Sequence, residues 1–126
     1  MNYYYKNNNP LKKRTGDCVI QALCNALDKP WEEVFMGLAE VGMLIYELPN
    51  NNSVWDIYLR NHGFTRHAIP NTCPDCYTVF DFCRDHPFGT YVLGTGTHAI
   101  SVINGTIFDT WNSSNEIPIV YYKKEV

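Results

Sequence analysis

The sequence predicts an α+β fold in which N-terminal helices pack on a C-terminal antiparallel β-sheet. In the first part of its 126 residues, apolar side chains recur at helical spacing, whereas after Gly89 apolar and polar side chains alternate. The pair at 104–105, Asn-Gly, lies between two alternating segments and is a strong hairpin signal. Helices that come first and antiparallel strands that come last are typical of α+β domains. The length fits a single domain, 1–126.

The first predicted helix covers 18–27 and begins after Asp17, a residue type that caps helix N-termini. Its apolar residues follow helical spacing, namely Val19, Ala22, Leu23 and Ala26. We therefore expect this helix to lie at the centre of the fold. The segment before it, 1–14, contains Pro10 and is predicted to be irregular.

Two further helices are predicted in the first half of the chain. One covers 30–40, because Pro30 suits a first helical turn. The other covers 54–62, with Ser53 as its N-cap. The loop between them, 43–52, is a candidate wall for any cleft beside the first helix.

The middle of the chain is predicted to hold one short strand and one short helix. The strand covers 64–69 and the helix covers 79–86. Thr78 and Asp81 match the spacing of a capping box, which marks the start of that helix. The loop 70–77 between them is a second candidate wall for a cleft.

The C-terminal part is predicted to form four strands, over 90–93, 98–103, 106–111 and 117–122. If the pair at 104–105 forms a two-residue turn, Val102 pairs with Ile107 across the hairpin. Paired residues share a face of the sheet, and so do residues two apart on a strand. This register fixes which side chains of the hairpin lie together.

The register places His98 and Asp109 on one face as diagonal neighbours, roughly 7–8 Å apart at the backbone. The other members of that face are apolar, namely Ile100, Val102, Ile107 and Trp111. We therefore expect the face to be buried. A His and an Asp on a buried face must satisfy each other or some third group.

The charge pattern argues against a nucleic-acid partner, and the pattern of apolar residues argues against a membrane. The formal net charge is −3, and the only basic run, at 12–14, is short. No apolar run is long enough to span a bilayer. The segment 1–9 lacks the apolar core of a secretory signal, so we expect a cytoplasmic protein whose five cysteines are reduced.

Three residues suggest thiol chemistry. Cys18 stands at a predicted helix N-terminus, where the helix favours the thiolate over the thiol. His98 and Asp109 lie on neighbouring predicted strands. A nucleophilic thiol, an imidazole base and a carboxylate that orients the imidazole are what a thiol hydrolase requires.

These residues resemble the papain-like cysteine peptidase fold, in which a Cys opens a helix and a later strand carries the His. The chain order Cys18, His98, Asp109 matches that pattern. The Asp-Cys pair at 17–18 and the block 96–102 are similar to the compact bacterial and phage branch that includes double-glycine leader peptidases. The resemblance covers 15–28 and 89–112.

The resemblance implies a cysteine peptidase with no cofactor, acting on a peptide or protein substrate. It implies that Cys18 is the nucleophile, that His98 is the general base and that Asp109 orients His98. The reaction would cleave a peptide, isopeptide or amide bond through a thioester.

The chain departs from the family where an oxyanion-hole Gln stands about six residues before the Cys. Position 12 holds Lys12, and no Gln precedes Cys18. The N–H of Cys18 can supply one donor, and the second has four candidates, namely Asn7, Asn8, Asn9 and Lys12. The departure leaves open an alternative, a catalytically inactive papain-like module that binds a peptide or protein.

A second motif raises the possibility of a structural zinc. The spacing Cys-x2-Cys-x6-Cys-x2-His sets out four candidate ligands, Cys73, Cys76, Cys83 and His86. The spacing fits no standard zinc finger. Free thiols or a redox-labile pair at the first two positions remain alternatives.

Overall fold

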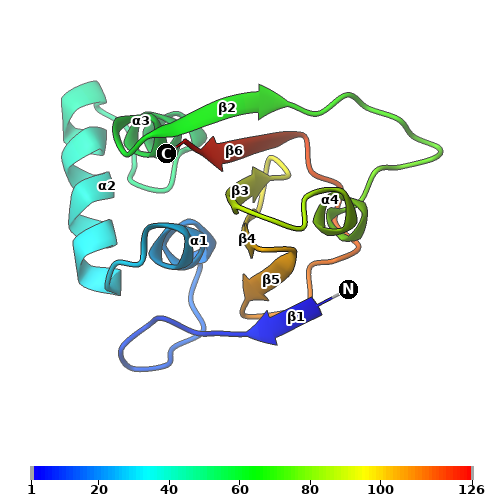
Figure 1. Cartoon of the computed structure of the whole chain (residues 1–126). Helices are drawn as coiled ribbons and strands as arrows, with labels where there is room; N and C mark the ends of the chain where they lie inside the picture. The colour runs from blue at the N-terminus through cyan, green and yellow to red at the C-terminus, as the bar shows by residue number, and fades with distance from the viewer. Residues whose placement is uncertain (1, 126) are drawn as a thin grey trace.

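The computed structural model describes residues 2–125 and contains one six-stranded sheet with helices on both faces (Figure 1). The predicted domain, 1–126, includes Met1 and Val126, which lie outside the described residues. The helices are α1 (Cys18–Leu27), α2 (Trp31–Ile45), α3 (Asn52–Asn61) and α4 (Val79–Asp85). The strands are β1 (Asn2–Tyr5), β2 (Phe64–Ala68), β3 (Thr90–Gly94), β4 (Ala99–Ile103), β5 (Thr106–Asp109) and β6 (Val120–Lys124).

The α+β prediction is confirmed, but the sheet is mixed rather than purely antiparallel. Its strand order is β1-β5-β4-β3-β6-β2. Strand β1 runs parallel to β5, with Tyr3 opposite Ile107, whereas all the other pairs are antiparallel. The prediction of an irregular 1–14 is therefore wrong for Asn2–Tyr5, where the tyrosines favour a strand once β5 offers an edge.

The two faces of the sheet carry separate hydrophobic clusters. On one face lie α1, α2 and α3, and on the other lies α4 (Figure 1). The α4 cluster includes Ile100, Val102 and Ile107, so burial of that predicted hairpin face is confirmed. Trp111 is the exception, since it stands beyond the end of β5 and is 42% exposed.

Helix α1 has the predicted bounds, but Asp17 does not act as its side-chain cap. The Oδ2 atom of Asp17 instead accepts hydrogen bonds from Gln21 Nε2 (3.0 Å) and from Trp31 Nε1 (2.9 Å). These bonds tie the start of α1 to the start of α2. The first N–H groups of α1 are consequently left without a capping side chain.

Helix α2 continues through Gly42 to Ile45, beyond the predicted end near Glu40. The chain then turns sharply at Tyr46, which adopts a left-handed conformation with φ of 59°. The returning backbone packs so closely that a Cβ added at Gly42 would stand 2.5 Å from the carbonyl oxygen of Glu47. Gly42 thus permits the turn that sends the following loop back toward α1.

The remaining helices follow the prediction with small shifts. Helix α3 is capped by Asn51, whose side chain accepts a hydrogen bond from the N–H of Ser53 (2.9 Å), so the prediction of Ser53 as the cap is wrong. The capping box of Thr78 and Asp81 at α4 is confirmed. None of the helices within residues 2–125 combines the length and apolar character that a membrane crossing requires.

Candidate active site

Cys18 is the first residue of α1, and its side chain is half-buried. The backbone N–H groups in the first turn of an α-helix have no partner within the helix, and in α1 no side chain caps them. The partial positive charge of a helix N-terminus favours an anionic sulfur at this position. The predicted placement of the thiol at a helix start is confirmed.

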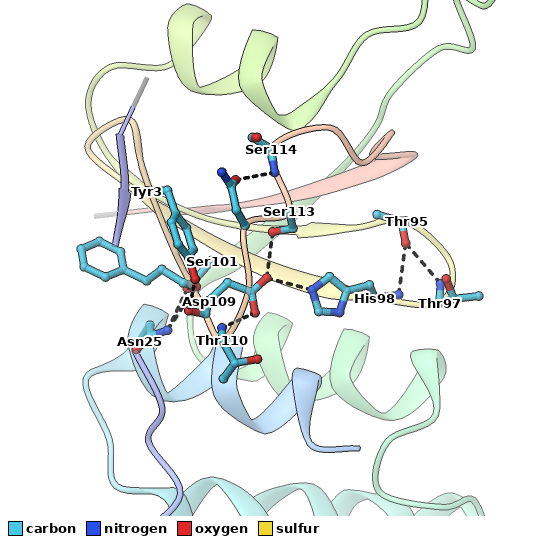
Figure 2. A network of polar contacts seen from close by, with 12 residues as sticks. Tyr3, Asn25, Thr95, Thr97, His98, Ser101, Asp109, Thr110, Ser113 and Ser114 are labelled. Atoms are coloured by element: carbon cyan, nitrogen blue, oxygen red, sulfur yellow. Dashed lines mark hydrogen bonds and ion pairs between the residues drawn. The ribbon is translucent and has the colours of Figure 1, made fainter. Parts of the chain in front are cut away.

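His98 and Asp109 are in contact, as the hairpin register predicts. Strands β4 and β5 pair Val102 with Ile107, and this brings the residue before β4 next to the last residue of β5. His98 Nε2 lies 2.8 Å from Asp109 Oδ2 (Figure 2). Because a carboxylate only accepts hydrogen bonds, His98 is the donor. This bond leaves Nδ1 as the ring nitrogen available to Cys18.

Other donors hold Asp109 in place. Its side chain is buried, and Oδ2 also accepts a hydrogen bond from the hydroxyl of Ser113 (2.8 Å). Its Oδ1 accepts from the backbone N–H of Thr110 (2.7 Å) (Figure 2). A buried carboxylate with three donors has a fixed orientation, which in turn fixes the ring of His98.

Cys18 and His98 line the same small cavity, of about 120 Å³. Burial by itself raises the pKa of the Cys18 thiol. Hydrogen bonding to His98 and to the backbone at Ala99, together with the positive charge of His98, outweighs burial and brings the pKa below its usual value. The cavity therefore favours the thiolate of Cys18.

His98 shows the opposite shift. Burial by itself lowers the pKa of the imidazole, but hydrogen bonds to Asp109 and Cys18 and the negative charges of both groups raise it to about 9. The lowered pKa of Cys18 and the raised pKa of His98 are two aspects of one coupled pair. Both shifts favour a thiolate beside an imidazolium over a neutral thiol beside a neutral imidazole.

Two loops and the start of α3 complete the cavity. The lining residues are Gly16, Cys18, Val19, Asn50, Asn52, Trp55, Gly96, Thr97, His98 and Ala99. The predicted wall 43–52 therefore contributes through Asn50 and Asn52, whereas no lining residue comes from 70–77. Trp111 packs against His98 with ring centroids 4.9 Å apart and shields the ring on one side.

The four residues proposed as oxyanion donors lie elsewhere. Gln21 Nε2 donates to Asn7 Oδ1 (2.8 Å), and Gln21 Oε1 accepts from the N–H of Asn8 (2.8 Å). The N–H of Asn9 donates to Asn7 Oδ1 (3.0 Å), and Lys12 Nζ donates to the Asn7 carbonyl (2.8 Å). None of the four lines the cavity, so that prediction is wrong. Asn7 and Asn8 fasten the N-terminal segment to α1, whereas Asn9 and Lys12 form bonds within that segment.

Asn50 lies in the predicted wall 43–52, but the sequence analysis gave it no role of its own. Its neighbour Asn52 is engaged, since Nδ2 donates to the carbonyl of Gly96 (3.3 Å) and Oδ1 accepts from Trp55 Nε1 (2.9 Å). The exposed amide of Asn50 has no hydrogen-bond partner among residues 2–125. The only sequence signal for this position was its location in the loop 43–52.

The four candidate zinc ligands do not come together. Cys73 and Cys76 form a disulfide, so the expectation of reduced cysteines is wrong for this pair. Cys83 is buried in the α4 cluster, and Nδ1 of His86 contacts the carbonyl of Phe82 (3.0 Å). Across the described chain, no group of three or more His, Cys, Asp or Glu residues is placed to hold a metal ion.

The site is interpreted from its geometry, because comparisons with known proteins found no match. No protein-family model matches the chain, and searches of curated proteins and of solved structures found no match. The structure defines a mixed α+β protein in which a cysteine and a histidine line one cavity and a buried aspartate is hydrogen-bonded to the histidine.

Proposed function

We propose that the protein is a cysteine peptidase that cleaves a peptide, isopeptide or amide bond. The observation that carries the proposal is that Cys18 and His98 share a cavity while Asp109 holds His98 from behind at 2.8 Å. A lowered thiol pKa beside a raised imidazole pKa is the charge state that nucleophilic thiol catalysis uses.

In the first step, the thiolate sulfur of Cys18 attacks the carbonyl carbon and forms a carbon–sulfur bond. The carbonyl oxygen becomes an oxyanion, which the N–H of Cys18 at the helix N-terminus stabilises. His98 gives its Nδ1 proton to the departing amine as the carbon–nitrogen bond breaks. The product is a thioester on Cys18 and a neutral His98.

In the second step, neutral His98 takes a proton from water, and the resulting hydroxide oxygen attacks the thioester carbon. The carbon–sulfur bond breaks, the carboxylic acid departs, and the thiolate–imidazolium pair is restored. Asp109 accepts a hydrogen bond from His98 Nε2 throughout, without taking the proton, and so holds the ring in one orientation. No redox partner or metal is needed for this balance.

A second oxyanion donor is proposed at Asn50. Its side chain lines the cavity of Cys18 and has no partner among residues 2–125, so its amide is available to a substrate oxygen. This residue takes the role that the resemblance gives to a Gln before the nucleophile. Asn50 and the N–H of Cys18 come from two different elements at the same cavity, so a substrate oxygen could be held by both donors.

The arrangement also supports a papain-like relationship, in the compact branch found in bacteria and phages. The support is the chain order Cys18, His98, Asp109 and the packing of α1 against the strands that carry the other two residues. The rival proposal is an inactive module of the same architecture that binds a peptide. The unusual pKa of Cys18 favours the enzyme, because a binding module has no use for it.

The test is site-selective alkylation followed by peptide hydrolysis. Cys18 should react with iodoacetamide near neutral pH well before Cys24 and Cys83, because burial raises the pKa of those two thiols to about 12 and about 11. Mass spectrometry identifies the labelled site. Hydrolysis of a mixed peptide library should vanish in Cys18→Ala and persist in Asp75→Asn, an exposed control. Slow labelling of Cys18 would favour the inactive module.

A further inference from the structure

We infer that the cavity beside Cys18, between α1 and α2, is a substrate subsite that selects a large apolar side chain. The inference rests on the proposed function and names the class of substrate that the enzyme prefers. The cavity has a volume of about 290 Å³ and is distinct from the small cavity that holds Cys18 and His98.

The two cavities are neighbours that share a wall. Gly16, Val19 and Asn50 line both of them, and Cys18 stands between Val19 and the loop that carries Gly16. A substrate whose carbonyl carbon reaches the sulfur of Cys18 therefore has a neighbouring side chain directed at this space. We assign the cavity to the substrate because it shares this wall with the cavity of Cys18.

The lining is mainly apolar. Its residues are Thr15, Gly16, Asp17, Val19, Ile20, Trp31, Phe35, Leu38, Pro49 and Asn50. A dry apolar cavity of about 150 Å³ is enough to hold a benzene-sized group. The space is thus sufficient for a phenylalanine or leucine side chain. Burial of such a side chain against the apolar lining is favourable in free energy.

An aromatic pair forms a rigid side of the cavity. Trp31 and Phe35 stack with ring centroids 5.3 Å apart and an interplanar angle of 15°. Trp31 is also fixed by the hydrogen bond from its Nε1 to Asp17. Phe35 remains 41% exposed in the protein alone, so its free surface is available to an apolar group.

Asp17 is the single charged residue in the lining. Its negative charge could attract a basic substrate side chain, which is the alternative occupant. Its Oδ2 is already engaged by Gln21 and Trp31, which draw the carboxylate toward the protein interior. The surrounding apolar residues outnumber it. The geometry therefore favours the apolar occupant over the basic one.

The experiment compares three chloroacetamides that alkylate Cys18 and differ only in the N-substituent: methyl, 2-phenylethyl and 4-aminobutyl. Rates at Cys18 are divided by the rates with free glutathione, which removes intrinsic reactivity. The phenylethyl reagent should then react roughly 10- to 100-fold faster than the methyl reagent, the scale on which a hydrophobic pocket discriminates. The aminobutyl reagent should gain little over methyl.

Matched variants test the assignment of the cavity. Phe35→Glu should reduce the phenylethyl-to-methyl ratio toward one, whereas Met36→Glu should keep it. Met36 is on the same helix, is exposed and lies outside the cavity. Circular dichroism checks that both variants fold. If either variant does not fold, the phenylethyl-to-methyl ratio of the wild type alone decides whether the cavity is an apolar subsite.

The outcomes separate this inference from the proposed function. Fast labelling of Cys18 by iodoacetamide with equal methyl and phenylethyl rates overturns the apolar subsite and leaves the peptidase proposal standing. A preference for the aminobutyl reagent overturns it in favour of a basic substrate. Slow labelling by iodoacetamide and by all three chloroacetamides overturns both.

Discussion

At the scale of single residues, the site depends on an exchange of charge between Cys18 and His98. The buried carboxylate of Asp109 draws the imidazole toward its protonated form, and the imidazolium then stabilises the thiolate. Each group alone would lose charge on burial. Together they keep charge in a space too small to hold much water, and this is what makes the thiol a nucleophile.

The pH dependence of hydrolysis should show this coupling. The rate should fall above about pH 9, where His98 loses the proton that the leaving amine needs. Asp109 raises the pKa of His98, so Asp109→Asn should move that alkaline limb to lower pH as well as slow the reaction. Asp75→Asn should leave the profile in place. An unmoved limb in Asp109→Asn would contradict the proposed role of the carboxylate.

The asparagines should separate into catalytic and structural groups. Asn50→Ala should lower kcat by roughly 100-fold or more, the scale of a lost oxyanion donor, with little change in melting temperature. Asn8→Ala should cost about 1–3 kcal/mol of stability, because it removes the Nδ2 group that donates to Asn25 Oδ1 (2.9 Å) and to Gln21 Oε1 (3.1 Å). Urea unfolding and peptide hydrolysis measure the two effects. Equal rate losses in both variants would contradict the division.

The three central residues could be identified from the sequence because each has a local signal. Cys18 follows a helix-start pattern, and the turn at 104–105 fixes the register that brings His98 to Asp109. Asn50 has no such signal, since its place depends on how far α2 continues and where it turns back. The sequence also suggested Asp17 as a cap, but its carboxylate is drawn instead to Trp31 on α2.

At the scale of the elements, the site is the meeting point of α1, the β4–β5 hairpin and the returning loop after α2. Asn25 of α1 donates to the hydroxyl of Ser101 in β4 (3.0 Å), which fixes the helix against the hairpin (Figure 2). The sharp turn at Tyr46 closes the third side. A change in any of these contacts should move one wall of the cavity relative to the others.

Gly42→Ala tests the third side. Alanine normally stabilises a helix relative to glycine, by about 1 kcal/mol. Here the new Cβ would meet the backbone carbonyl of Glu47, so we expect a loss of about 1–3 kcal/mol instead. Hydrolysis should fall as well, because the same loop carries Asn50. A stabilised and fully active Gly42→Ala would show that the turn is not tightly packed.

Element prediction succeeded where signals are local and failed where pairing is distant. The hairpin and the capping box of α4 depend on residues a few positions apart, and both are confirmed. Strand β1 takes its partner from β5, more than a hundred positions later in the chain, and the short run Asn2–Tyr5 gives no sign of this by itself. Helix α2 passed its predicted end because the packing around Gly42 compensates for the glycine.

At the scale of the whole molecule, the sheet separates two regions with different roles. The α1–α3 side carries the cavity that Cys18 lines and the neighbouring apolar cavity that shares a wall with it. The α4 side carries the second hydrophobic cluster and the loop with the Cys73–Cys76 disulfide, which projects away from α1 (Figure 1). The zinc hypothesis could not be settled from spacing, since the same Cys-x2-Cys pattern also suits a disulfide.

The free energy of unfolding should reveal the internal proton transfer. Folding lowers the pKa of Cys18 and raises the pKa of His98, so the first shift makes stability rise with pH and the second makes it fall. The two effects oppose each other, so this site should give the wild type only a shallow dependence of stability on pH. In Cys18→Ala the bond to Asp109 still raises the pKa of His98 and no lowered thiol pKa offsets it, so stability should fall more steeply as pH rises above about 6.5, the pKa of an unperturbed imidazole.

Urea unfolding at several pH values measures this slope. The double variant Cys18→Ala with His98→Gln is the control, because it removes both titrating groups and should restore a flat profile. A flat profile in Cys18→Ala alone would mean that His98 is not held in its protonated form.

The most direct measurement is the ultraviolet absorbance of the Cys18 thiolate as a function of pH, taken as the difference between the wild type and Cys18→Ala. We predict a midpoint below about 8.5, the usual thiol pKa, and a shift upward in His98→Gln. A midpoint at or above the usual value, unchanged by His98→Gln, would contradict the thiolate–imidazolium pair.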